Sequence, residues 1–205
     1  MFLSAAIKRY GVLALLALLQ ACATTSGPIN TPPTQAQTQT TAQHLQQIST
    51  IQQFSLKGRM GVQTDAKGFS GRLDWQHQLT TDHIALYSPL GSQVASIKKT
   101  PDSVVLEDSS GNSVSAEDAE SLTQKTLGWK LPLTGLADWS LGRPTASPIL
   151  ASTADELGRL TTLKQDGWDI EYSDYADFEG KQLPNKIYMR SPKVNIKLIV
   201  ENRSH

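Results

Sequence analysis

The segment VNIKLIV, residues 194–200, decides the fold class because its apolar side chains recur at every second position. The series starts at Val194 and ends at Val200, with the polar Asn195 and Lys197 between its members. Side chains of a β-strand point alternately to opposite faces, so a period of two predicts a strand with one buried face. The segment therefore indicates a sheet that buries one side and exposes the other.

The same alternation occurs earlier in the chain. Residues 56–62 and 69–76 place apolar or small side chains at alternate positions, and residues 65–68 between them are typical of a hairpin turn. Turns rich in Gly, Asp and Ser separate several further segments with strand character. These segments are residues 83–87, 93–98, 103–107, 113–115, 157–164, 168–174 and 186–189. The sequence thus predicts a meander of about ten to eleven short strands.

Helical periodicity precedes the first strand. Leu45, Ile48 and Ile51 recur at steps of three, and Phe54 closes the series. This spacing predicts a short amphipathic helix over residues 41–54 that lies on the sheet.

A second helical region interrupts the strands between residues 116 and 142. Residues 116–120, AEDAE, have the acidic composition of a helix start, and Leu133, Leu136 and Trp139 follow at helical spacing. A long antiparallel sheet must twist and curl. We therefore expect an α+β, mainly β, domain built as a barrel or half-barrel, with the helices across its opening.

The N-terminus has the layout of an export signal. Lys8 and Arg9 precede the apolar residues 11–19, a run too short to span a bilayer. Residues 23–42 are dominated by Thr, Gln, Pro, Ser and Gly, a composition typical of a disordered tether. We expect a signal peptide over residues 1–21, a lipidated N-terminus and tether over 22–42, and one domain over 43–205.

Cys22 is the only cysteine in the chain. It follows Leu19, Gln20 and Ala21, and the four residues resemble the bacterial lipobox, in which the cysteine receives a diacylglycerol. An ordinary signal cleavage with an idle thiol is the alternative. Ala23 stands where an aspartate favours retention at the inner membrane in bacterial lipoproteins. By this resemblance we expect lipidation at Cys22 and anchoring to the outer membrane, facing the periplasm.

Charge and motifs exclude several function classes. Removing Lys8 and Arg9 leaves 17 basic against 19 acidic residues, a formal charge of −2 that does not favour nucleic acid. The four histidines are not spaced as metal ligands, and the sequence has no phosphate loop or dinucleotide fingerprint. We expect no catalytic residues, no metal and no cofactor. The chain also has four tryptophans, which can form a core or line an apolar ligand site.

The turn Pro89-Leu90-Gly91 interrupts a strand and carries a single leucine. Such a leucine usually folds back onto its own domain. The other reading is that Leu90 points outward as an apolar tip that can touch acyl chains.

Taken in order, these pieces resemble the LolB family of outer-membrane lipoproteins. The chain departs from the family at Ser140, where a bulky aliphatic residue is frequent, and at Arg143, where leucine is frequent. The resemblance rests on residues 19–22, 58–59, 72–76, 89–92, 116–120, 131–133, 136, 139, 141–144, 168–175, 183–184 and 196–198.

The resemblance implies a receptor that accepts acylated lipoproteins from a LolA-like periplasmic carrier and inserts them into the outer membrane without nucleotide. It implies an unclosed antiparallel barrel whose apolar concave face is covered by helices. It also implies a monomer, held to outer-membrane lipids by its N-terminal anchor, whose loop Pro89-Leu90-Gly91 engages the membrane. The expected acyl-chain site consists of Trp75, Leu133, Leu136, Trp139, Trp168, Ile170, Ile196 and Leu198.

Two other functions remain open. An outer-membrane lipoprotein could scaffold envelope assembly through exposed sheet edges, with no acyl-binding cavity. An envelope hydrolase would need a nucleophile with an adjacent base, and no local spacing supplies one.

Overall fold

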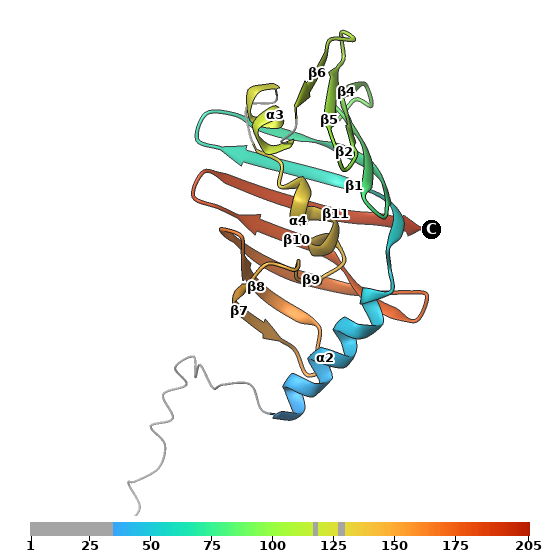
Figure 1. The fold of residues 1–205 in the computed structure, drawn as a ribbon, viewed down its shortest axis with the longest axis vertical. Helices are drawn as coiled ribbons and strands as arrows, with labels where there is room; N and C mark the ends of the chain where they lie inside the picture. Colours follow the sequence, from blue (N-terminus) through green and yellow to red (C-terminus); the bar gives the residue numbers. More distant parts are fainter. Residues whose placement is uncertain (1–34, 117–118, 127–129) are drawn as a thin grey trace, which may run out of the picture. The chain divides into compact units, whose positions relative to one another are not determined.

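The structure, a computed structural model, describes residues 35–116, 119–126 and 130–205. These residues contain one antiparallel sheet of eleven strands, in the order β6-β5-β4-β3-β2-β1-β11-β10-β9-β8-β7 (Figure 1). Neighbours in this order are consecutive in the chain, except β1 and β11 at the centre. The strands are β1 (Gln53–Thr64), β2 (Gly68–Gln78), β3 (Thr81–Tyr87), β4 (Gln93–Lys99), β5 (Val104–Asp108), β6 (Ser113–Ala116), β7 (Ile149–Ala154), β8 (Leu160–Gln165), β9 (Trp168–Phe178), β10 (Lys181–Arg190) and β11 (Val194–Ser204).

The sheet is open. Within the described residues, β6 pairs only with β5, and β7 pairs only with β8. This confirms the expected unclosed antiparallel architecture. The strand β7 was not anticipated, because its residues are exposed and show no alternation of apolar and polar side chains.

The helices of the described residues are α2 (Gln35–Ser49), α3 (Ala119–Thr126) and α4 (Leu133–Ser140). α4 confirms the helical spacing that was read from Leu133, Leu136 and Trp139. The expected acidic helix start at residues 116–120 includes Glu117 and Asp118, which lie outside the described residues.

The expected helix over residues 41–54 has the wrong bounds. α2 begins at Gln35, within the segment expected to be a tether, and it ends at Ser49. The hydroxyls of Ser49 and Thr50 donate hydrogen bonds to backbone carbonyls in the last turn of α2. In a longer helix these carbonyls would accept bonds from the amides of the next turn, so the hydroxyls take the place of those amides where the helix ends. Phe54 belongs to β1 and is buried with the sheet.

Strand register places the apolar side chains on one face. Leu56 lies opposite Trp75, and Met60 lies opposite Leu198, and all four are almost completely buried. The prediction from residues 194–200 is therefore confirmed, and this face forms the core.

The opposite face carries cross-strand ion pairs. Lys57 Nζ lies 3.6 Å from Asp74 Oδ2, and Arg59 Nε lies 2.7 Å from Glu201 Oε1. These side chains are largely exposed, so the pairs contribute little to stability but keep this face hydrated.

The turns fall at two opposite ends of the sheet, as the strand registers require. We call one the Leu90 end and the other the His77 end. The Leu90 end carries the turns at residues 65–67, 88–92, 166–167 and 191–193. The His77 end carries the turns at residues 79–80, 100–103 and 179–180.

The short helix α4 lies over the apolar face of the sheet, in front of β10 and β11 in Figure 1. Its side chains Leu133, Leu136 and Trp139 are at most 1% exposed and belong to the same core as the sheet residues. None of the helices in the described part of the chain is long and apolar enough to cross a membrane.

Gly58 marks a close approach at the centre of the sheet. β1 and β11 change register between Lys57 and Gly58, and a Cβ on Gly58 would collide with the carbonyl oxygen of Ile199. The next glycine in the strand, Gly61, has nothing within 4 Å of its Cβ position.

We predict that Gly58→Ala lowers the free energy of unfolding by about 2 kcal/mol, because backbone atoms must move to admit the methyl group. Gly61→Ala is the matched control and should change it by less than about 0.5 kcal/mol. Urea unfolding followed by tryptophan fluorescence measures both. Equal effects of the two substitutions would contradict the assignment of Gly58 as the crowded position.

Candidate functional site

The eight side chains expected to bind acyl chains all lie in one core. Trp168 is the most exposed of them, at 8%, and each of the others is at most 2% exposed. The structure therefore brings together every residue of the predicted set, from α4 and from the three strands β2, β9 and β11. It also places them on the same side of the sheet, which sequence alternation had left undecided.

A polar group inside this core is fully paired. Trp139 Nε1 donates to Gln165 Oε1 at 3.1 Å, and Gln165 is completely buried. The same oxygen accepts the Thr145 amide at 2.9 Å, while Gln165 Nε2 donates to the Ser147 carbonyl at 2.6 Å. The indole N–H of Trp139 and the side-chain amide of Gln165 therefore both have hydrogen-bond partners. α4 can bury its tryptophan without leaving a buried N–H unpaired.

Two arginines hold the C-terminal end of α4. Arg143 Nε donates to Asp138 Oδ1 at 2.7 Å, and its Nη1 donates at 2.8 Å to the carbonyl of Ile48, in α2. Arg203 Nη2 donates to the Ser140 carbonyl at 2.8 Å, and burial lowers the pKa of Arg203 to about 10. Cations at these positions also complement the negative end of the helix dipole.

The N-terminal end of α4 is held differently. Pro132 occupies the N-cap position and makes no side-chain capping bond. The adjacent Leu131 amide donates to Thr123 Oγ1 at 3.0 Å, which ties this end to α3.

Sequence reasoning missed Arg203 for a definite reason. A simple alternation from Val200 would place residue 203 on the exposed face. The register shift beside Gly58 inserts one extra residue in β11, so Arg203 lies opposite Leu56 and turns toward the core. No local signal in the sequence marks this bulge.

The prediction also missed three buried atoms that lack a partner among the described residues. They are His44 Nε2, Tyr172 Oη and Arg203 Nε. Burial, followed by the charge of Arg159, lowers the pKa of His44, and burial raises that of Tyr172 well above its usual value. Both residues are therefore neutral at neutral pH.

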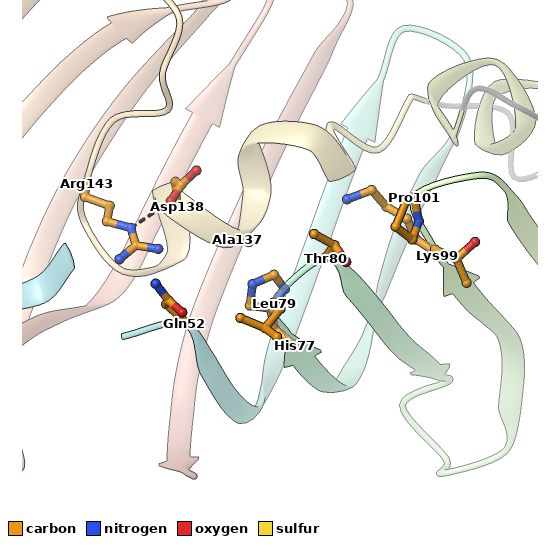
Figure 2. A pocket seen from close by; sticks show the side chains of 10 residues that line it. Gln52, His77, Leu79, Thr80, Lys99, Pro101, Ala137, Asp138 and Arg143 are labelled. Carbon is orange, nitrogen blue, oxygen red and sulfur yellow. Dashed lines mark hydrogen bonds and ion pairs between the residues drawn. The ribbon is translucent and has the colours of Figure 1, made fainter. Parts of the chain in front are cut away.

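A polar hollow of about 540 Å³ lies at the His77 end, beside α4 (Figure 2). His77 and Leu79 stand on one side of it, and Lys99 and Arg143 lie toward opposite ends. It is lined by Gln52, His77, Leu79, Thr80, Lys99, Thr100, Pro101, Ala137, Asp138 and Arg143.

A buried carboxylate organises the wall of this hollow. Asp82 is 3% exposed and accepts Trp75 Nε1 at 2.9 Å, while His77 Nδ1 lies at 2.7 Å and Lys99 Nζ at 3.2 Å. Burial alone would raise the pKa of Asp82. The hydrogen bonds to His77 and Trp75 and the charge of Lys99 outweigh burial and hold this pKa below its usual value.

A second hollow, of about 570 Å³, lies at the Leu90 end. It is bounded by the β8–β9 turn, the β10–β11 turn, α3 and Lys130. Its lining residues are Gln124, Lys130, Asp166, Gly167, Trp168, Ser191, Pro192, Lys193 and Val194.

The turn with Leu90 projects from the same end of the sheet. Leu90 is 95% exposed, and Gly91 has a φ of 90°, which favours glycine. The Ser88 amide donates to the Ser92 carbonyl at 2.8 Å and closes the loop. The leucine does not fold back onto its own domain, so the outward alternative is the one that the structure adopts.

Cys22, the expected lipidation site, lies outside the described residues. Within the described residues, no group of three or more His, Cys, Asp or Glu side chains is placed to hold a metal ion.

The open sheet places the chain in a fold class that includes solved structures. A LolA-superfamily protein from Nitrosomonas europaea matches with a TM-score of 0.53 and 10% identity over 81% of this chain and 92% of that one. A DUF1329-family protein from Desulfovibrio piger also matches with a TM-score of 0.53, at 7% identity over 85% of this chain and 94% of that one. These likenesses concern the fold alone.

Sequence comparison then identifies the family. The model of the family "Outer membrane lipoprotein LolB" matches residues 52–202. Outer-membrane lipoprotein LolB of Nitrosococcus oceani is 33% identical over 93% of this chain and 94% of its own length. That of Thiobacillus denitrificans is 34% identical over 96% of this chain and 97% of its own. The chain belongs to the LolB family of outer-membrane lipoproteins, which confirms the resemblance seen in the sequence.

We predict that Asp82→Ala lowers the free energy of unfolding at pH 7 by about 3 kcal/mol, because it leaves buried donors and a cation without their partner. Asp74→Ala removes an exposed ion pair and should cost less than about 1 kcal/mol. Urea unfolding of the two variants provides the comparison.

The loss should also depend on pH. The folded pKa of Asp82 lies below its ordinary value of 3.8, so its stabilisation is present above pH 3.8 and is lost as the pH falls through the folded value. The difference between wild type and Asp82→Ala should therefore shrink in acid. A difference that stays constant down to the acid unfolding limit would argue against a charged Asp82.

Proposed function

We propose that this protein is an outer-membrane-anchored receptor that accepts acylated lipoproteins from a LolA-like periplasmic carrier and inserts them into the outer membrane. The observation that carries the proposal is the apolar face beneath α4, in a chain that belongs to the LolB family. The proposed acyl site is the set of eight predicted core residues, on a concave face that the helices cover.

Physical chemistry explains why such a receptor needs an apolar interior. Exposing an acyl chain to water costs about 0.8 kcal/mol per methylene, or roughly 8 kcal/mol for ten of them. Cargo must therefore move from one apolar environment to the next. Transfer requires no nucleotide if each acceptor binds the chains more tightly than the previous one. The protein acts as a binding protein and not as an enzyme.

The proposed interior is closed in the structure described. Its side chains are at most 8% exposed, so an entering chain must displace contacts between α4 and the sheet. Aliphatic and aromatic side chains in the core can give up contacts with one another and contact the methylenes of an acyl chain instead. The net cost in free energy is small because both kinds of contact are apolar. A buried ion pair in the same place would oppose the entry of an acyl chain.

The anchor and the turn have separate roles in this proposal. Cys22 carries lipid chains that hold the receptor at the outer membrane, after a signal peptide proposed for residues 1–21. The tether proposed for residues 22–42 links this anchor to the domain, and its residues 35–42 form the start of α2. Leu90, exposed at the tip of its turn, enters the membrane when cargo is released. The domain itself, proposed as residues 43–205, works as a monomer.

The decisive experiment mixes the full chain, with Cys22→Ala to keep it soluble, with an acylated lipoprotein held by a competent carrier. Pull-down then reports which protein holds the cargo. We expect the lipoprotein to move onto this chain without nucleotide. Cargo that stays with the carrier would refute the receptor function and leave envelope scaffolding as the working explanation.

We further predict that Leu90→Glu accepts cargo as wild type does but inserts at least tenfold less of it into outer-membrane vesicles, because a charged tip resists entry into lipid. Leu79→Glu is the matched control, since Leu79 is also an exposed turn leucine, at 60%, but lies at the His77 end. Floated vesicles measure the inserted lipoprotein. Equal insertion by Leu90→Glu and Leu79→Glu would remove Leu90 from the mechanism.

A further inference from the structure

The two hollows differ in what separates them from the apolar core. They lie at opposite ends of the sheet and have similar volumes, about 540 and 570 Å³. Either could in principle lead an acyl chain beneath α4. Their walls decide which one does.

Charged groups close the hollow at the His77 end. Asp82 and Lys99 form an ion pair on one side, and Arg143 and Asp138 form another on the α4 side. Arg143 also binds the Ile48 carbonyl, so opening this end would detach α4 from α2. A methylene chain passing here would strip water and partners from at least two ion pairs, which is costly in an apolar environment.

At the Leu90 end, the charged residues that line the hollow, Lys130, Asp166 and Lys193, are exposed, and its two buried lining residues are apolar. Trp168 and Val194 line it and are also core residues, with exposures of 8% and 5%. Behind Trp168 lies Trp139 of α4, with ring centroids 6.4 Å apart. Rotation of one side chain, that of Trp168, would therefore connect the hollow with the space beneath α4.

The residue before Trp168 is an uncrowded turn glycine. Gly167 precedes Trp168 in the β8–β9 turn with a φ of 79°, and nothing lies within 4 Å of its Cβ position. Within the described residues, the indole of Trp168 forms no hydrogen bond that would have to break, in contrast to the indole of Trp139, which donates to Gln165.

We propose that the hollow at the Leu90 end is the port through which an acyl chain of the cargo enters and leaves the core, and that Trp168 is its gate. The inference rests on the proposed receptor function and adds a route to it. Because the port and Leu90 share one end of the sheet, a departing chain emerges beside the turn that would touch the membrane.

The test blocks each hollow in turn. In the full chain with Cys22→Ala, Lys193→Cys places a thiol at the rim of the port, and Thr80→Cys places one at the hollow of the His77 end. Both parent residues are exposed. Each variant is measured before and after labelling with a bulky maleimide, so that the substitution itself is controlled. The probe is a fluorescent tripalmitoylated cysteinyl peptide mixed by stopped flow.

We expect the label at position 193 to slow uptake of the probe at least tenfold, and the label at position 80 to change it by less than twofold. Slowing by the label at 80 alone, or by neither label, would overturn the port. Failure of the unlabelled wild type to bind the probe would instead refute the receptor function, so the two failures are distinguishable.

A second variant tests the gate. Trp168→Ala should raise both the association rate and the dissociation rate of the probe, because it widens the passage in both directions. Trp168→Phe, which keeps an aromatic ring, should restore slower exchange. If Trp168 served only to pack the core, Trp168→Ala would change the affinity or the stability but would not raise both the association rate and the dissociation rate.

Discussion

The whole structure depends on the burial of one apolar face of a single sheet. A β-sandwich hides such a face against a second sheet, whereas here a helix of eight residues contributes Leu133, Leu136 and Trp139 to that task. Hydrogen bonds from Arg143 and Arg203 fix its C-terminal end, and the buried amide of Gln165 accepts its tryptophan. Stability and access to the core are therefore governed by the same few contacts around α4.

This arrangement separates two kinds of chemistry along the sheet. Near the His77 end, Asp82 gathers donors and a cation into a buried polar cluster that resists rearrangement. Near the Leu90 end, the buried side chains that line a hollow are Trp168 and Val194, and its charged lining residues are exposed. Non-directional apolar contacts can exchange partners at little cost, while a buried ion pair cannot. One end of the sheet is thereby suited to rigidity and the other to passage.

Much of this could be read from the sequence, because strand alternation is a local signal. It located the core residues of β1, β2 and β11 and the helical spacing of α4. It failed where tertiary context decides. β7 is an exposed edge strand without alternation, α2 begins in a polar segment, and Arg203 turns inward because of a bulge. The Asp82 cluster was equally invisible, since its members come from three strands and meet only through register.

The central seam of the sheet has a consequence for the order of folding. Pairing of Leu56 with Arg203 joins residues almost a full domain apart in sequence, whereas strands β1 to β6 and β7 to β11 are each linked by short turns. Contacts between distant residues form slowly because a long loop must close first. The two halves can therefore assemble as local meanders, but they cannot join until the last strand is available. A chain that is exported from its N-terminus therefore cannot pair β1 with β11 until almost all of it has crossed the membrane, and until then it can still pass through a channel as an unfolded chain.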